Sequence, residues 1–183
     1  MRVISGNFRG LKLVAPTGDN TRPTLDRVRE AIFSMLMPII PDAACLDLFA
    51  GSGAMGIEAL SRGADSACFV DLSTEAIDCV NANLKKIKLT DKTQVIRSDY
   101  CDFLKNCHNQ FDIIFLDPPY DGNMYERCLE LIHNNNLLKP SGIIVAEWDY
   151  ELGFDVTTNH FDVVKNKKYG RVGVSVLKRS EPV

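Results

Sequence analysis

Residues 47–56 read DLFAGSGAMG, and their glycines at positions 51, 53 and 56 follow an apolar run and precede an amphipathic one. A Gly-x-Gly-x-x-Gly turn between a strand and a helix, with an acidic residue about twenty positions later, is typical of a nucleotide-binding fold. Asp71 stands at that distance. The stretch therefore predicts a strand–turn–helix unit that holds a nucleoside-containing ligand at the glycine loop.

Apolar runs and amphipathic segments alternate on both sides of this turn. Strands are predicted over residues 44–49, 66–71, 93–98, 111–117 and 142–148, and helices over 25–36, 54–63, 74–87, 99–106 and 124–134. Thr24 is expected to cap the first helix. Residues 3–14 and the tail around Tyr169-Gly170 each read as a pair of short strands. Near-continuous apolar strands that alternate with helices indicate a parallel sheet covered on both faces. We therefore predict an α/β, Rossmann-like doubly wound fold, mostly parallel, with an antiparallel edge.

The composition is that of one globular domain with a core, since 45% of the 183 residues are hydrophobic. No apolar run approaches the roughly 18 residues of a membrane helix, and the charged N-terminus does not read as a signal peptide. The six cysteines include no C-x-x-C pair, which indicates reduced thiols in a cytoplasmic protein. The three histidines are isolated from one another, so we expect no metal site.

The net charge of −3 is unevenly distributed along the chain. Residues 1–29 hold six Lys or Arg and two acidic residues, and residues 163–183 hold six Lys or Arg and one acidic residue. Most acidic residues lie between these two basic ends. If the ends meet on one face, that face would attract phosphates. Ordinary surface charge explains the same counts.

Four predicted strands end at or beside an acidic residue: Asp47, Asp71, Asp99 and Asp117. Parallel strands present their carboxyl ends at one edge of the sheet, where ligands bind. A dinucleotide would place its pyrophosphate on the helix N-terminus, and Asp47 would repel it there. S-adenosylmethionine carries ammonium and sulfonium charges and no phosphate. We therefore expect this methyl donor, with its amino group at Asp47, its ribose at Asp71 and its adenine at Asp99.

Residues 115–122 read FLDPPYDG and leave the predicted strand through two prolines. Proline fixes φ and removes a hydrogen-bond donor, so Pro118 and Pro119 hold the backbone rigidly. The Asp117 carboxylate and the Pro118 carbonyl would be two acceptors for an exocyclic amino group. They would aim its lone pair at a methyl group, while Tyr120 would stack on a base turned out of its helix. The alternative is a rigid strand-to-helix turn with a surface tyrosine.

The chain resembles the RsmD-type 16S ribosomal RNA guanine-N2 methyltransferases in four stretches: MRVISGNFRGLKL, TRPTLDRVREAIFSML, DLFAGSGAMGIEALSRGA and FLDPPY. Its KYGRVGVSVL is similar to the closing strands of that family, so the resemblance covers nearly the whole chain. DPPY alone is less specific, because DNA adenine-N6 methyltransferases share it. The resemblance implies a class I S-adenosylmethionine-dependent methyltransferase fold with a small N-terminal β-hairpin extension.

The resemblance also implies how the chain divides and which residues act. Residues 1–23 would form the hairpin extension and residues 24–183 the methyltransferase domain. The family's cofactor motif falls on Asp47, Gly51, Ser52, Gly53, Asp71 and Asp99, with Asp71 replacing a more usual glutamate. Its catalytic motif falls on Asp117, Pro118, Pro119 and Tyr120. Its basic N-terminal region falls on Arg2, Arg9, Lys12 and Arg22, which would bind RNA. The implied partner is 16S rRNA in an assembling small ribosomal subunit, and we expect a cytoplasmic monomer with no membrane contact.

Three other functions fit part of the pattern. A DNA amino-methyltransferase uses the same DPPY chemistry, but sequence-specific enzymes of that kind usually need a recognition domain, for which this chain has no spare length. An NAD-dependent oxidoreductase accounts for the glycines and leaves Asp47 and DPPY unexplained. A non-catalytic RNA-binding module leaves the intact acidic residues unexplained.

Overall fold

A single seven-stranded sheet runs through the computed structural model, which describes residues 1–17, 26–119, 123–153 and 160–180. The strands are β1 (Ala44–Leu48), β2 (Ser66–Asp71), β3 (Thr93–Arg97), β4 (Phe111–Leu116), β5 (Leu138–Asp149), β6 (Phe161–Tyr169) and β7 (Val172–Arg179). Their order is β3-β2-β1-β4-β5-β7-β6. The first five are parallel, and β7 is antiparallel to both β5 and β6. The predicted mostly parallel sheet with an antiparallel edge is confirmed.

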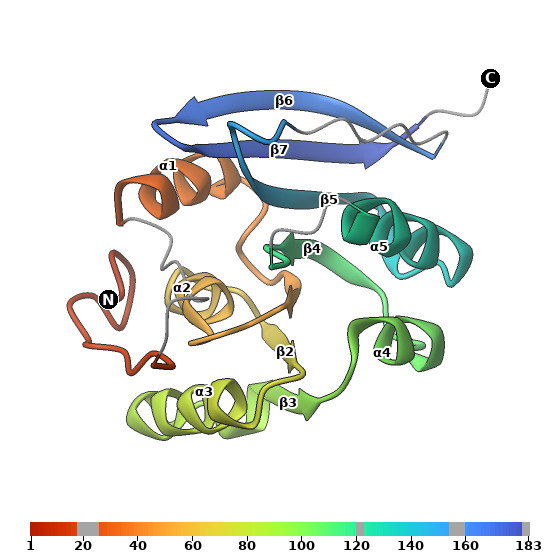
Figure 1. The fold of residues 1–183 in the computed structure, drawn as a ribbon. Helices are drawn as coiled ribbons and strands as arrows, with labels where there is room; N and C mark the ends of the chain where they lie inside the picture. The colour runs from red at the N-terminus through yellow and green to blue at the C-terminus, as the bar shows by residue number, and fades with distance from the viewer. Residues whose placement is uncertain (18–25, 120–122, 154–159, 181–183) are drawn as a thin grey trace.

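Five helices of the described residues cover the sheet: α1 (Asp26–Leu36), α2 (Ala54–Ser61), α3 (Thr74–Ile87), α4 (Tyr100–Asn106) and α5 (Asn123–Asn134). Figure 1 shows α1, α2 and α3 on one face and α4 and α5 on the other. A 3₁₀ turn, Thr90–Lys92, leads into β3. Each face has its own apolar cluster, because the strands point side chains alternately to the two faces. No helix in these ranges is long and apolar enough to cross a membrane.

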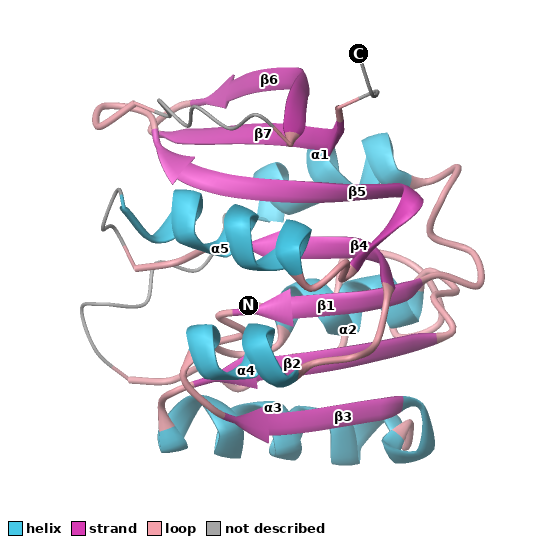
Figure 2. Cartoon of the chain, turned by 90° about the vertical axis from the view of Figure 1, so that its right-hand side faces the viewer, coloured by secondary structure: helices cyan, strands magenta, loops and turns pink. Residues whose placement is uncertain are grey.

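The carboxyl ends of the parallel strands meet at one edge of the sheet. Asp47 lies on β1, Asp71 ends β2, and Asp117 directly follows β4. In Figure 2 the arrowheads of these strands point to the same side of the molecule. The order of the strands reverses between β1 and β4, which is where open α/β sheets bind ligands. The fold therefore gathers the predicted acidic residues at a ligand-binding edge.

The N-terminal segment, residues 1–17, differs from the two strands predicted over residues 3–14. It forms a looped hairpin with one isolated bridge, between Arg2 and Lys12, and turns between them. The reason is that its N–H groups bond to α2 instead of a partner strand: those of Ile4 and Ser5 donate to the Glu58 carboxylate at 2.8 and 3.0 Å. Farther along, Asn7 and Phe8 donate to Ser61 on the same helix. Side-chain and backbone acceptors of α2 thus take the place of a longer ladder between the two arms of the segment.

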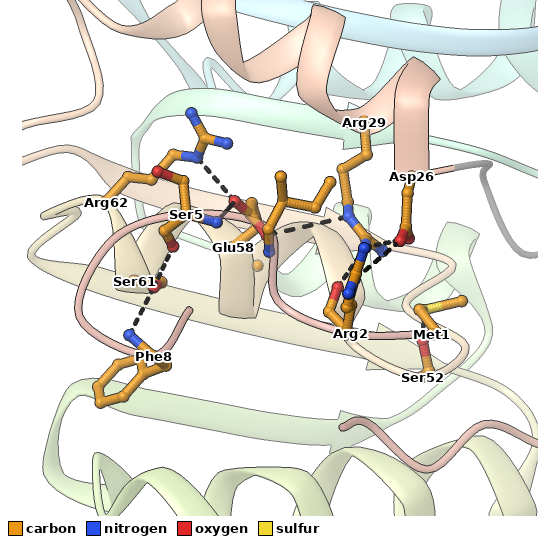
Figure 3. Close-up of polar contacts among 12 residues, drawn as sticks. Met1, Arg2, Ser5, Phe8, Asp26, Arg29, Ser52, Glu58, Ser61 and Arg62 are labelled. Carbon is orange, nitrogen blue, oxygen red and sulfur yellow. Dashed lines mark hydrogen bonds and ion pairs between the residues drawn. The ribbon is translucent and has the colours of Figure 1, made fainter. Parts of the chain in front are cut away.

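Glu58 is the centre of a buried charge cluster that joins the N-terminal segment to α1 and α2 (Figure 3). It accepts from Arg62 Nε at 2.7 Å and lies 3.9 Å from Arg29 Nε. Arg29 is fully buried and donates through Nη2 to Asp26 at 3.0 Å and to the Arg2 carbonyl. Burial lowers the pKa of Arg29, and the Glu58 and Asp26 carboxylates oppose that shift. A buried guanidinium of this kind depends on its carboxylate partners.

β5 starts earlier than the predicted strand, at Leu138 rather than residue 142. Its first residues include Pro140. Proline has no N–H to donate to a ladder, so the sequence predicts a loop at this position. The register with β4 shifts between Phe111 and Ile113, so the proline falls within an irregular stretch of pairing. Prolines are tolerated at such bulges.

Candidate functional site

A cavity of about 440 Å³ opens at the carboxyl edge of the sheet, a size in the range of small-molecule sites. The ends of β1, β2, β4 and β5, the glycine loop and the start of α4 form its walls, and the N-terminal segment closes one side. Of the predicted site residues, it brings together Asp47, Gly51, Ser52, Asp71, Asp99, Asp117, Pro118 and Pro119. Tyr120 and Arg22 lie outside the described residues, as do Pro23 and the expected cap Thr24.

The backbone geometry of the loop explains why two of its positions are glycine. Gly53 precedes α2 with φ +76°, a left-handed conformation that glycine adopts without a Cβ penalty. At Gly56 a Cβ would stand 2.4 Å from the Phe69 ring on β2, so only glycine lets α2 pack this closely on the sheet. The glycine at position 56 thus serves helix–strand packing.

Asp47 organises the start of α2 from the neighbouring strand. Gly53 offers α2 no side-chain cap, and Asp47 Oδ2 accepts from the Gly56 N–H at 2.9 Å instead. The Asp47 side chain is buried and lines the cavity. The pKa of Asp47 is raised to about 7: burial is the largest cause, the bond from the Gly56 N–H opposes it, and the neighbouring carboxyls of Asp117 and Asp71 add to the rise. A cation in the cavity would therefore stabilise the ionised form.

Asp71 links the glycine loop to the next helix. Its Oδ2 accepts from the Gly51 N–H at 2.9 Å and its Oδ1 from the Ser73 N–H at 2.9 Å. Both oxygens face donors from loops that border the cavity, and each keeps a second lone pair. The carboxylate is therefore oriented by the backbone and still able to accept from ligand hydroxyls.

Asp99 caps α4 through one oxygen. Its Oδ1 accepts from the N–H groups of Cys101 at 2.8 Å and Asp102 at 3.4 Å, while no bond to Oδ2 occurs within the described ranges. Beside it, the rings of Phe49 and Tyr100 lie 5.4 Å apart and form an apolar wall. Phe49 has φ +76°, an outlier for a bulky side chain, and such strain clusters at functional sites. No local pattern in the sequence indicates this aromatic pair.

Asp117 opens into the cavity next to the two prolines. The residue is exposed to solvent, and it lines the concave wall of the cavity. Desolvation at this concave surface raises the pKa of Asp117.

Glu147 on β5 is a second carboxylate at this end of the cavity. It was not identified as a site residue from the sequence, because it stands inside an apolar strand. The acid-lined cavity favours a cationic ligand over a phosphate.

The N-terminal segment forms a wall of the cavity through Met1, Ala15 and Pro16. Asn83 on α3, which is fully buried, holds this wall to the glycine loop. Its Oδ1 accepts from the Val14 N–H at 2.8 Å, and its Nδ2 donates to the carbonyls of Val14 at 2.8 Å and Ser52 at 3.0 Å. One side-chain amide therefore positions two walls of the cavity. The sequence contains a signal from which this role could have been found, because Asn83 is a polar residue on the apolar stripe of α3.

Replacing Asn83 with alanine is expected to lower the free energy of unfolding by about 1–3 kcal/mol, since it leaves partly buried backbone groups unpaired. The ligand affinity of the cavity should fall as well, because the Met1 and Ser52 walls lose their common support. Urea denaturation checks the first effect, and Asn81→Ala on the exposed face of α3 is the matched control. Equal stability of the two variants would show that Asn83 does not hold the segment.

The predicted RNA-binding cations have different surroundings. Arg2 is exposed and forms an ion pair with Asp26 at 3.4 Å. Arg9 and Lys12 are exposed on the N-terminal segment. In Figure 1, α1 lies between this segment and the β6–β7 hairpin. The two basic ends of the sequence therefore lie on either side of α1.

Comparison with known proteins gives a consistent match over the whole length. The family model described as Conserved hypothetical protein 95 matches residues 1–178. The "Putative rRNA methyltransferase YlbH" of Bacillus subtilis is 43% identical over 182 residues, which cover 98% of this chain and 99% of the relative. The Ribosomal RNA small subunit methyltransferase D of Haemophilus influenzae is 39% identical over 175 residues, 94% of this chain and 90% of the relative. The solved structure of the "Putative methyltransferase yhhF" of Escherichia coli has a TM-score of 0.88 and 36% identity, and covers 98% of this chain and 97% of that one.

Proposed function

The chain belongs to the family of the ribosomal RNA small subunit methyltransferases D, and on that basis we propose that it methylates the exocyclic N2 amino group of a guanine in 16S rRNA with S-adenosylmethionine as donor. The observation that carries the proposal is that Asp117, Pro118 and Pro119 line the same cavity as the acidic residues of the glycine-loop side. An amino-group site would thus lie beside a methyl-donor site.

The cavity residues fit S-adenosylmethionine. Asp47 and Asp117 have raised pKa values, so positive charge in the cavity would be stabilised by their ionisation. Asp71 keeps lone pairs for ribose hydroxyls, and Asp99 Oδ2 is open to an adenine amino group within the described residues. Bound there, the donor supplies an electrophilic methyl group, whose transfer breaks its bond to sulfur and forms the new bond to nitrogen.

Asp117 is proposed to be the residue that positions the amino group and accepts its proton. Its carboxylate would accept an N–H of the guanine amino group and fix the direction of the nitrogen lone pair, a contribution of positioning and preorganised acceptors. After transfer it would take the proton that the nitrogen loses and pass it to water. Its raised pKa matches that task, because a base with a pKa near the working pH both accepts and releases a proton.

We also propose the setting of the reaction. The N-terminal extension would bind rRNA phosphates through Arg2, Arg9 and Lys12. The target base would be contacted by Arg22, Pro119 and Tyr120. The substrate would be rRNA in an assembling small subunit, and the protein would act as a monomer in the cytoplasm.

The choice of donor predicts a ligand-specific stabilisation. S-adenosylmethionine or S-adenosylhomocysteine at about a hundred times its dissociation constant should stabilise the fold by about 2.7 kcal/mol, seen as a higher Tm. NAD should leave the Tm unchanged, because its pyrophosphate would meet Asp47. A Tm raised by NAD and not by S-adenosylmethionine would overturn the proposed function.

A further inference from the structure

The basic hairpin, which we define as β6, β7 and the turn between them, concentrates positive charge at one edge of the sheet. Residues 160–180 carry six Lys or Arg and one acidic residue in a chain of net charge −3. β6 is the outermost strand, and all of its residues between Phe161 and Tyr169 are exposed. Lys165, Lys167 and Lys168 are among them. This charge plays no part in the donor site described above.

The turn of the basic hairpin lies at the same end of the strands as the cavity. Asp149, the last residue of β5, pairs with the first residue of β7, which puts the β6–β7 turn at the carboxyl end of the parallel strands. Glu147, which lines the cavity, pairs with Val174, and Val174 pairs with Lys167. Neighbouring strands lie about 4.8 Å apart, so the backbone of Lys167 is about 10 Å from that of Glu147.

The lysines of β6 reach both sides of the hairpin. Lys165 and Lys167 point to the same face of β6 as Tyr169, which packs on the α1 side of the sheet. Lys168 points to the opposite side, where its Nζ lies 3.8 Å from the centre of the Tyr150 ring. Tyr150 in turn stacks on Trp148 at 5.3 Å. Lys168 is therefore held in place, and the other two lysines extend over the face on which α1 lies.

One arginine of the basic hairpin, Arg171, is neutralised by carboxylates, whereas two of its lysines are not. Arg171 pairs with Asp149 at 2.9 Å and with Glu151 at 3.5 Å. By contrast, Lys165 and Lys167 form no ion pair or hydrogen bond with any described residue. Unpaired positive charge beside a ligand cavity attracts phosphates at long range and binds them at short range.

Protection of the sheet edge is the ordinary explanation for lysines on an outer strand, because charges there block pairing with another sheet. That role is satisfied by either sign of charge. It does not account for three cations and a single acid along one strand beside the cavity, in a chain that is acidic elsewhere. A reversal of sign separates the two roles, since it keeps the edge charged and repels phosphate.

We propose that the basic hairpin is a second RNA-binding surface, which grips backbone phosphates next to the target nucleotide on the side of the cavity away from the N-terminal segment. The inference rests on the proposed function. In this arrangement the RNA spans the cavity mouth between two basic regions separated by α1 (Figure 1), and the target base enters between them. Lys165 and Lys167 bind phosphates and carry no sequence information.

The test compares two charge-reversed proteins of equal net charge. One carries Lys165→Glu and Lys167→Glu, and the control carries Lys85→Glu and Lys105→Glu, exposed lysines near the far ends of α3 and α4. The probe is unmodified 16S rRNA transcribed in vitro, and its dissociation constant is measured over a range of salt. The hairpin variant should bind about tenfold more weakly at low salt, with a slope of log affinity against log salt shallower by about 1.5. The control should stay near wild type.

Three further readouts keep the outcomes distinct. Tm and affinity for S-adenosylhomocysteine should be unchanged in the hairpin variant, and its methylation defect should appear in KM for RNA and not in kcat. Wild-type affinity and slope would overturn the proposal, even where methylation of assembled subunits falls, because the surface would then contact ribosomal protein. Absence of methyl transfer by the wild-type protein to both transcript and subunits would instead overturn the proposed function.

Discussion

The Asp117→Ala protein is expected to bind S-adenosylhomocysteine within a few-fold of wild type and to transfer methyl groups about a hundred to a thousand times more slowly. Removing one preorganised partner of the reacting group typically costs that much in kcat. The Asp117 carboxylate makes no hydrogen bond to a described residue, and desolvation at the cavity wall raises its pKa. Its removal should therefore leave the Tm unchanged or slightly higher.

The control for this prediction is Asp78→Ala, which deletes an exposed carboxylate on α3. Isothermal titration gives the cofactor affinity, and single-turnover kinetics with saturating RNA gives the transfer rate. A parallel loss of affinity and rate would mean that Asp117 supports the cavity and has no part in the chemistry. Asp117→Asn keeps one oxygen acceptor and should fall between alanine and wild type.

The Glu58→Ala protein is expected to lose about 3–5 kcal/mol of stability, because truncation leaves the buried Arg29 without its main counter-charge. Arg29 already has two nitrogens, Nε and Nη1, without a hydrogen-bond partner among the described residues. The N–H groups of Ile4 and Ser5 lose their acceptors in the same step. Figure 3 shows why the effect spreads, since these contacts tie the N-terminal segment to α1 and α2.

Chemical denaturation measures this loss, and a second variant separates charge from shape. Glu58→Gln keeps the size and one oxygen acceptor, so it should cost less than alanine. The pair Arg29→Met with Glu58→Leu should recover part of the loss, because apolar replacements remove the uncompensated charge. A single Glu58→Ala variant as stable as wild type would show that the cluster contributes nothing to holding the segment.

The regular elements with clear periodicity could be predicted from the sequence. β2 and α3 match their predicted ranges residue for residue, since an apolar run bounded by turns and a stripe at helical spacing are both local signals. The acidic residues at strand ends were found for the same reason, because strand direction alone brings Asp47, Asp71 and Asp117 to one edge. Family resemblance then supplied the choice of base.

The parts that could not be predicted depend on contacts between distant residues. Ile4 gives its N–H to Glu58, 54 positions away, so no local pattern shows that residues 3–14 bond to a helix. Arg29 stands on the apolar stripe of α1, but its carboxylate partner Glu58 is 29 positions away, so no local pattern identifies the buried pair. Glu147 lies in an apolar strand whose role at the cavity follows from the sheet order.

The most direct test of the proposed function is the identity of the methylated nucleoside. Purified protein, S-adenosylmethionine with a labelled methyl group, and small ribosomal subunits from cells that lack the enzyme are incubated together. The rRNA is then digested and its nucleosides are separated and identified by mass. The proposed function predicts that the label appears in N2-methylguanosine at one position and is absent with Asp117→Ala. Label in a methylated adenosine, or none in rRNA while DNA is labelled, would contradict it.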